Sequence, residues 1–143
     1  MATATAGTST ATDTDQIKRL GHDYAHAVDT GDLDALVGLF APDGLWDPSA
    51  LGMDTAQGSD EIRAFFDANS KVFPASFHLT SNHVVDVDAD TATGASYLHA
   101  FVLDAAGAKQ EVLGRYVDEY VRTSDGWKFQ RRALLPLLAP SDS

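Results

Sequence analysis

The first half of the chain shows the apolar spacing of amphipathic helices. Between Asp15 and Gly31, apolar residues recur every three or four positions, and the pattern returns after Asp32 and again after Ser59. Asp32 and Ser59 are suitable helix caps, while the turn sequence at 41–44 ends the second helix and Pro74 ends the third. The three apolar stripes are Ile17, Leu20, Tyr24, Ala27 and Val28; Leu33, Leu36, Val37, Leu39 and Phe40; and Ile62, Phe65 and Phe66. We therefore expect three helices, with a short strand at 45–47.

The second half of the chain predicts strands. Four long segments, at 76–88, 91–103, 110–122 and 127–135, are separated by short connections rich in Asp, Gly and Ser. Long consecutive strands joined by short turns form an antiparallel meander. Helices followed by strands indicate the α+β class.

The strand at 91–103 carries small residues on one face. Gly94, Ser96 and Ala100 share that face with Leu98 and Val102, so we expect room for a ligand there. The opposite face carries Tyr97, His99 and Phe101. Because neither face is polar, we expect the sheet to be covered on both sides, with helices and a cavity on one and a partner subunit on the other.

Length and composition limit the possible functions. The chain has 143 residues, 44% of them hydrophobic, and no cysteine, so it forms one domain without disulfides or thiolate metal sites. A net charge of −11 disfavours binding to nucleic acids or anionic membranes. We expect a disordered tail at 1–14, a domain at 15–138 and a short tail at 139–143. No leader or membrane span is evident, so we predict a cytoplasmic protein.

Three local strings and the order of elements resemble the SnoaL-like, nuclear transport factor 2-like superfamily. The strings are GDLDALVGLFAPDG from Gly31, GSDEIRAFF from Gly58 and DGWKF from Asp125. The resemblance covers about residues 15 to 136. It implies a cone in which three N-terminal helices pack on a strongly curved antiparallel or mixed sheet that encloses a pocket.

Within this superfamily the chain is most similar to scytalone dehydratase, lindane dehydrochlorinase and bile-acid 7α-dehydratase. The resemblance implies a catalytic set of Tyr24, Asp29, His78 and Arg132. His78 would be the general base, Asp29 would fix its tautomer, and Tyr24 would donate a hydrogen bond. A basic residue on the last strand, either Arg131 or the preferred Arg132, would hold a developing negative charge.

Two features depart from this pattern. The second long strand carries Ala100 where the bile-acid enzyme has an acid, and Asp104 could substitute only if the strand extends that far. On a regular helix, Asp29 lies about 140° from Tyr24, so we expect Asp29 to reach the pocket only where the helix has ended or frayed.

Other residues are candidates for the pocket wall. We expect Trp46 and Asp47 on the short strand and Asn82 on the first long strand to face the substrate; the remaining wall candidates are Phe66, Leu98, Ala100 and Asp104. The pair His22 and His26 has the i, i+4 spacing of a metal site, but lacks a carboxylate to complete it, so we expect helix surface and no metal. No glycine-rich phosphate loop is present, and no cofactor is predicted.

The sequence therefore favours a cofactor-independent lyase or isomerase acting on a hydrophobic cyclic small molecule, such as a polyketide, terpenoid or steroid-like compound. One alternative is a non-catalytic domain that binds a small molecule or another protein. Another is an epoxide hydrolase or cyclase, which would need two acids and an arginine around one water. We expect a homodimer or homotrimer formed through the outer sheet face.

Overall fold

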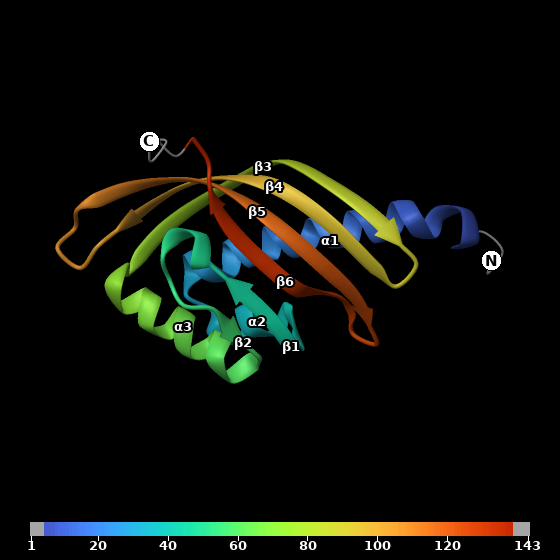
Figure 1. Ribbon diagram of the computed structural model, residues 1–143, viewed down its shortest axis with the longest axis horizontal. Helices are drawn as coiled ribbons and strands as arrows, with labels where there is room; N and C mark the ends of the chain where they lie inside the picture. The colour runs from blue at the N-terminus through green and yellow to red at the C-terminus, as the bar shows by residue number, and fades with distance from the viewer. Residues whose placement is uncertain (1–4, 139–143) are drawn as a thin grey trace.

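The computed structural model describes residues 5–138 and contains a six-stranded sheet with helices on one side (Figure 1). The helices are α1 (Thr5–Thr30), α2 (Leu33–Gly38), the short 3-10 helix η2 (Ser49–Leu51) and α3 (Ser59–Val72). The strands are β1 (Phe40–Asp47), β2 (Ala56–Gln57), β3 (Ala75–Asp88), β4 (Thr91–Leu103), β5 (Lys109–Thr123) and β6 (Gly126–Pro136).

The sheet is mixed and has the order β2-β1-β6-β5-β4-β3. Strands β3 to β6 form an antiparallel meander, and β1 adds to it in parallel beside β6. The sheet arches over α1, while α2, α3, β1 and β2 close the lower side (Figure 1). The predicted α+β cone with three helices and a curved mixed sheet is confirmed.

The core is centred on Tyr24, which projects from α1 and is 2% exposed. Its ring lies 5.7 Å from the ring of Tyr116 on β5 and 6.1 Å from those of Trp46 on β1 and Phe66 on α3. The packing is edge-on for Tyr116 and Phe66 and tilted for Trp46, and it joins four elements that are distant in sequence. The apolar helix stripe and the inner faces of the strands therefore meet at one aromatic cluster.

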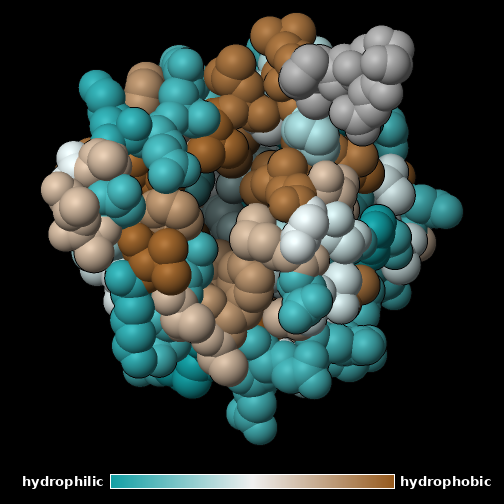
Figure 2. All heavy atoms as spheres, turned by 60° about the vertical axis from the view of Figure 1, so that its left-hand side comes forward, coloured by the Kyte–Doolittle hydropathy of each residue, from teal (hydrophilic) through white to brown (hydrophobic). Residues whose placement is uncertain are grey.

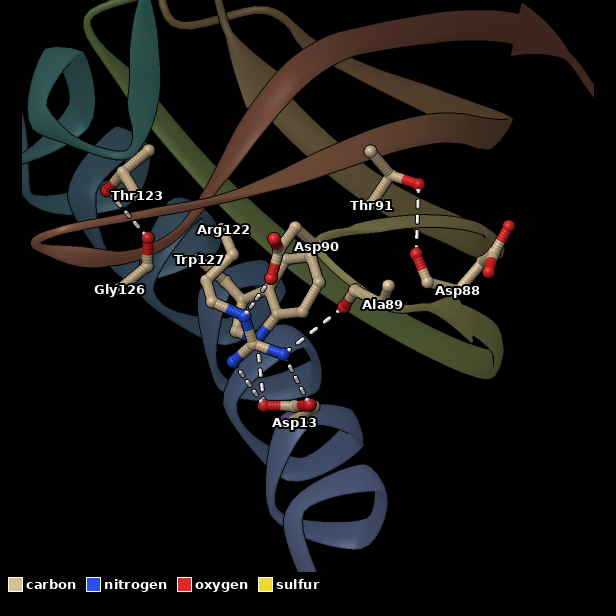
Figure 3. Close-up of polar contacts among 9 residues, drawn as sticks. All are labelled: Asp13, Asp88, Ala89, Asp90, Thr91, Arg122, Thr123, Gly126 and Trp127. Carbon is tan, nitrogen blue, oxygen red and sulfur yellow. Dashed lines mark hydrogen bonds and ion pairs between the residues drawn. The ribbon is translucent and has the colours of Figure 1, made fainter. Parts of the chain in front are cut away.

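Helix α1 begins at Thr5, ten residues before the start that the apolar spacing predicts. Asp13 explains why, because it is buried and accepts two hydrogen bonds of 2.8 Å from Arg122 and one of 3.1 Å from Trp127 (Figure 3). These partners stand on β5 and β6, more than 100 positions away, so local periodicity could not reveal them. Residues 1–4 and the tail at 139–143 lie outside the described part of the chain.

The second helix is shorter than predicted and β1 is longer. Helix α2 ends at Gly38, and Phe40 already pairs with Phe129 of β6. Pairing is interrupted between Phe40 and Leu45, where Pro42 has no N–H to donate. A Cβ at Gly44 would lie 3.0 Å from two backbone oxygens, which only glycine avoids there. The turn-like sequence is therefore an irregularity inside a strand.

The start of α3 also differs from the prediction. Ser59 is the first helical residue, and the cap position is taken by Gly58, which makes no side-chain cap bond. Instead, Glu61 in the first turn accepts a hydrogen bond of 3.0 Å from the backbone N–H of Gln57. The acid in the first turn therefore binds a backbone donor that precedes the helix, and the side-chain cap predicted at Ser59 is not formed.

The small-residue face of β4 divides into two parts. Leu98, Ala100 and Val102 line a cavity, as expected. Gly94 does not, because a Cβ there would lie 3.0 Å from the Tyr120 ring. The space that Gly94 leaves therefore accommodates Tyr120, and the ligand cavity is confined to the second half of the strand.

Candidate functional site

A pocket of about 610 Å³ lies between α1, α3 and the concave face of the sheet. It opens at the end of the molecule where α1 and α3 finish, and Figure 2 shows a hollow on this face bordered by hydrophobic side chains. Leu51 and Met53 form part of the wall and are partly exposed, while Asn69, Ser70 and Gln110 add polar groups. This volume is typical of a site for a small organic molecule.

Asp29 and His78 meet in the wall of this pocket. Asp29 Oδ1 lies 2.6 Å from His78 Nδ1. The same carboxylate accepts a hydrogen bond of 2.8 Å from the Ser76 hydroxyl and one of 3.0 Å from the His78 backbone N–H. A carboxylate can only accept hydrogen bonds, so His78 Nδ1 carries the hydrogen in this contact and donates it to Asp29. The other ring nitrogen, Nε2, is then the basic one.

Asp29 reaches the pocket from within α1, and the expectation that the helix must end before it is wrong. The helix continues to Thr30, and Gly31 follows with φ of 70°. The pocket surrounds the end of α1, so residues on different sides of its last turns all line it; Tyr24, Ala27, Val28 and Asp29 do so. Tyr24 and Asp29 can therefore both line the pocket even though their side chains leave the helix in different directions.

Tyr24 and Tyr116 form the inner part of the wall. Burial raises the pKa of Tyr24 well above its usual value and raises the pKa of Tyr116 to about 12. Both hydroxyls therefore stay protonated near neutral pH and can act as hydrogen-bond donors. Tyr116 was not among the site residues predicted from the sequence, although it shares the inner face of β5 with Asp118.

Arg132 lies behind these tyrosines and not in the pocket wall. Its guanidinium carbon is 3.5 Å from the centre of the Tyr116 ring and 4.4 Å from that of Tyr24. Its Nε is 3.2 Å from Asp118 Oδ1, and both residues are about 1% exposed. Two aromatic rings therefore separate the charge of Arg132 from the cavity in which it was expected to hold a developing negative charge.

Asp118 continues into a hydrogen-bonded chain. Tyr120 donates a bond of 2.7 Å to Asp118, and His83 Nε2 lies 3.1 Å from the Tyr120 hydroxyl. Burial lowers the pKa of His83 to about 4, and the nearby charge of Arg132 acts in the same direction. His83 is therefore neutral near pH 7 and serves as a structural partner of Tyr120.

Ala100 lies directly opposite His78 in the pairing of β3 with β4. It lines the pocket and is 1% exposed, so the position next to the histidine holds only a methyl group. His99, beside it in sequence, is exposed on the outer face and pairs with Glu111 at 2.7 Å. The strand position opposite His78 therefore carries no acid, and Asp67 on α3 is the acid that lines the pocket besides Asp29.

Four predicted wall residues line the pocket and three do not. Trp46, Phe66, Leu98 and Ala100 do. Asp47 instead pairs with Arg131 at 2.6 Å and accepts hydrogen bonds from Ser49, which lower its pKa. Asp104 accepts bonds from the N–H groups of Ala106 and Ala108 in the β4–β5 turn.

Asn82 is also outside the pocket, because it lies in a bulge of β3. Pairing with β4 shifts between Ser81 and Val84, and Asn82 has φ of 54° and is exposed. A bulge inserts an extra residue and changes which face the following side chains occupy. Asn82 therefore does not share a face of β3 with His78, although the two are an even number of residues apart. Ser76, two positions before His78 in the regular part of the strand, does share that face and lines the pocket.

Within residues 5–138, no three His, Cys, Asp or Glu side chains come together as a metal site would require. His22 and His26 are both exposed on α1. In that same part of the chain, no helix is long and apolar enough to cross a membrane.

Comparison with known proteins agrees with this architecture. A family model for the SnoaL-like domain matches residues 9–133. Uncharacterized proteins of Mycobacterium tuberculosis and Mycobacterium bovis are 36% identical over 125 residues, covering 82% of this chain and 80% of each relative. A crystal structure of a candidate aromatic ring hydroxylase from Novosphingobium aromaticivorans superimposes with a TM-score of 0.85 at 34% identity, covering 90% of this chain and 92% of the other.

A candidate scytalone dehydratase from the same organism has a TM-score of 0.82 at 24% identity, with 90% of this chain and 87% of the other covered, which shows a common fold. The family model spans most of the chain, and the mycobacterial relatives share more than a third of the aligned residues. The chain therefore belongs to the SnoaL-like domain family of the nuclear transport factor 2-like superfamily.

Proposed function

We propose that this protein is a cofactor-independent lyase or isomerase that acts on a hydrophobic cyclic small molecule, of polyketide, terpenoid or steroid-like type. The observation that carries the proposal is the 2.6 Å contact between Asp29 and His78 in the wall of a largely apolar pocket. A histidine whose Nδ1 is held by a carboxylate presents Nε2 as a general base.

The proposed reaction starts with removal of a proton from a carbon next to a carbonyl group. His78 Nε2 takes the proton, and the electron pair of the broken C–H bond moves onto the carbonyl oxygen. Asp29 stabilises the imidazolium, and Tyr24, which stays protonated, donates a hydrogen bond to the oxygen as it gains charge. A positioned base of this kind contributes about 10²–10⁴-fold to the rate.

The second step follows from the missing acid at Ala100. With no carboxylic acid opposite His78, the imidazolium is the proposed proton donor for the second half of the reaction. It can return the proton to another carbon, which completes an isomerisation, or pass it to a leaving hydroxide, which completes a dehydration. Both outcomes restore the neutral histidine, so one base serves the whole cycle.

Arg132 has an indirect role in this proposal. Its charge lies under the rings of Tyr24 and Tyr116 and lowers the pKa of each, opposing the larger effect of burial. A phenol with a nearby cation is a stronger hydrogen-bond donor. We therefore regard Arg132 as a positioning residue that acts through the tyrosines.

The alternatives receive less support. An epoxide hydrolase would need two acids and an arginine around one water, yet Asp47, Asp104 and Arg132 are each engaged outside the pocket. The Asp29 carboxylate contacts three donors and fixes His78 in one orientation, an arrangement that favours catalysis over binding alone. The name of the Novosphingobium neighbour, a candidate aromatic ring hydroxylase, supports a ring-shaped ligand.

Exchange of an acidic C–H proton tests the proposal without knowledge of the natural substrate. 2-Tetralone in D₂O with the wild-type protein should lose its α-protons faster than in buffer, as followed by proton NMR. His78→Ala should reduce the enzymatic rate by about 10²-fold or more. His26→Ala, at an exposed histidine of the same protein, is the matched control. Equal rates for wild type and His78→Ala would refute the proposal.

A homodimer or homotrimer through the outer sheet face remains part of the proposal. Phe77, Leu79, Val84 and Tyr97 are between 42% and 63% exposed on β3 and β4, opposite the pocket side. Several large apolar side chains exposed on neighbouring strands favour association. A cytoplasmic location and the lack of a cofactor likewise remain predictions from the sequence.

A further inference from the structure

Trp46 carries a buried hydrogen-bond donor that is not used within the protein. The side chain is 3% exposed and lines the pocket. Its Nε1 has no hydrogen-bond partner among the described residues. The nearest rings are those of Phe66 at 5.3 Å, Phe65 at 6.0 Å and Tyr24 at 6.1 Å. Phenylalanine rings offer no oxygen to accept the bond.

Such a donor is uncommon because burial removes it from water without replacing the lost bond. The other tryptophan shows the usual arrangement, since Trp127 Nε1 donates to Asp13 at 3.1 Å. The two indoles therefore differ in whether the N–H has an acceptor, and the one without an acceptor among the described residues is Trp46 in the pocket wall. A ligand oxygen would supply its missing acceptor.

The position of Trp46 along the pocket gives the size of that ligand. Trp46 packs beside Tyr24, and Tyr24 precedes Asp29 by five residues on α1, which corresponds to about 7.5 Å along the helix axis. The strand register gives the order of depth. Trp46 is level with Arg132 and Asp118, beyond the inner end of the pocket lining on β4, whereas His78 is level with Ala100 in the middle of that lining, so Trp46 is the deeper site. Two fused six-membered rings are about as long as this separation.

We propose that the Trp46 indole N–H is a specificity-determining donor that binds an acceptor oxygen at the buried end of the substrate. The substrate class is then a molecule of at least two fused rings, with its reacting carbon near His78 and a carbonyl, hydroxyl or ether oxygen at the far end. This inference deepens the proposed function and rests on it for the reacting end only, because recognition by Trp46 requires no catalysis.

Two probes with nearly the same shape isolate the hydrogen bond. 2-Acetylnaphthalene carries a C=O group, and 2-isopropenylnaphthalene carries a C=CH₂ group in its place. Dissociation constants for both are measured by titration calorimetry with wild-type protein and with Trp46→Phe. The wild-type preference for the ketone should fall about five- to tenfold in the variant, the effect of one neutral hydrogen bond. An unchanged preference, or no ketone binding to wild type, would overturn the inference.

An NMR measurement on the wild-type protein keeps the test decisive even if Trp46→Phe does not fold. The indole N–H signals of ¹⁵N-labelled protein are recorded with each probe, and Trp127 is the internal control. The Trp46 signal should move downfield with the ketone and not with the alkene, while the Trp127 signal stays in place. Equal responses of Trp46 to the two probes would mean that its N–H faces a ring and would overturn the inference.

The His78→Ala variant separates this inference from the proposed function. It should lose proton exchange yet keep the ketone preference, because Trp46 and His78 come from β1 and β3, at opposite sides of the sheet. If the ketone preference persists while wild-type exchange is no faster than in buffer, the proposed reaction fails and the recognition role stands. If exchange is fast and the preference is absent, the recognition role fails alone.

Discussion

The guanidinium carbon of Arg132 lies 4.4 Å from the centre of the Tyr24 ring, and the ring separates it from the pocket. The cation is fully buried and is balanced by Asp118 at 3.2 Å. Burial disfavours its charge, but Asp118 and the surrounding tyrosines more than compensate, and the pKa of Arg132 is raised. A permanent charge is therefore fixed behind the inner wall.

Removal of this charge should destabilise the fold strongly. Arg132→Met leaves the Asp118 carboxylate buried without its cation, and breaking a buried pair in this way costs about 3–5 kcal/mol. The free energy of unfolding, measured in urea, should fall by about that amount. The double variant Arg132→Met with Asp118→Asn should recover much of the loss. A single variant within about 1 kcal/mol of wild type would contradict the interpretation.

The pH dependence of stability should report on His83. Its pKa is about 4 in the folded protein and 6.5 when unperturbed, so the unfolded chain binds the proton first as pH falls. Stability should therefore decrease between about pH 6.5 and pH 4, by about 1–2 kcal/mol for a half-buried group. Urea unfolding at pH 7, 6 and 5 measures it.

His83→Gln is the control for this prediction. Glutamine keeps a hydrogen-bonding group near Tyr120 but does not titrate, so the difference between wild type and variant isolates the histidine from the carboxylates. The difference in unfolding free energy should shrink as the pH falls. A difference that is constant with pH would show that His83 is protonated freely in the folded state.

Asp13 should hold the first half of α1 against the sheet. Asp13→Ala removes the acceptor for both Arg122 and Trp127, and the first half of the helix then loses these polar contacts to β5 and β6. Amide exchange at residues 12–20 should become at least about tenfold faster, with little change at residues 24–30. Asp15→Ala, at an exposed aspartate two residues further along the helix, is the control. Unchanged exchange would mean that apolar packing alone fixes this segment.

Two charges on the outer face should disrupt the proposed oligomer. Leu79 and Tyr97 are 52% and 42% exposed on neighbouring strands, so aspartate at both positions should not disturb the core. Light scattering after size exclusion should give a dimer or trimer for wild type and a monomer for Leu79→Asp with Tyr97→Asp. A wild-type monomer at high micromolar concentration would refute association through this face.

Much of the fold was accessible from the sequence because most signals are local. The periodicity of α1 beyond residue 15 and the turns between the long strands depend on near neighbours, and their positions agree with the structure within a residue or two. The pairing of Phe40 with Phe129 and the anchoring of Asp13 depend on distant residues. For that reason β1 and the start of α1 were misplaced.

Less of the candidate site than of the fold could be predicted from the residues alone. The contact between Asp29 and His78 came from resemblance, since spacing alone placed Asp29 away from Tyr24. The bulge at Asn82 reversed an argument from strand parity, and no pattern in the sequence marks it. Arg132 was assigned to the pocket from a resemblance to a basic residue on the last strand, and its side chain is covered by two tyrosines.

The central claim is that Asp29 makes His78 a base, and Asp29→Asn tests it most directly. An amide in this position no longer fixes the Nδ1 hydrogen or stabilises the imidazolium. The measurement is the rate of 2-tetralone α-proton exchange in D₂O, with Ser76→Ala as control, because Ser76 contacts the same carboxylate without touching the histidine ring. The account predicts at least about a tenfold loss for Asp29→Asn and a smaller one for Ser76→Ala. Wild-type exchange rates in Asp29→Asn, with the histidine intact, would contradict it.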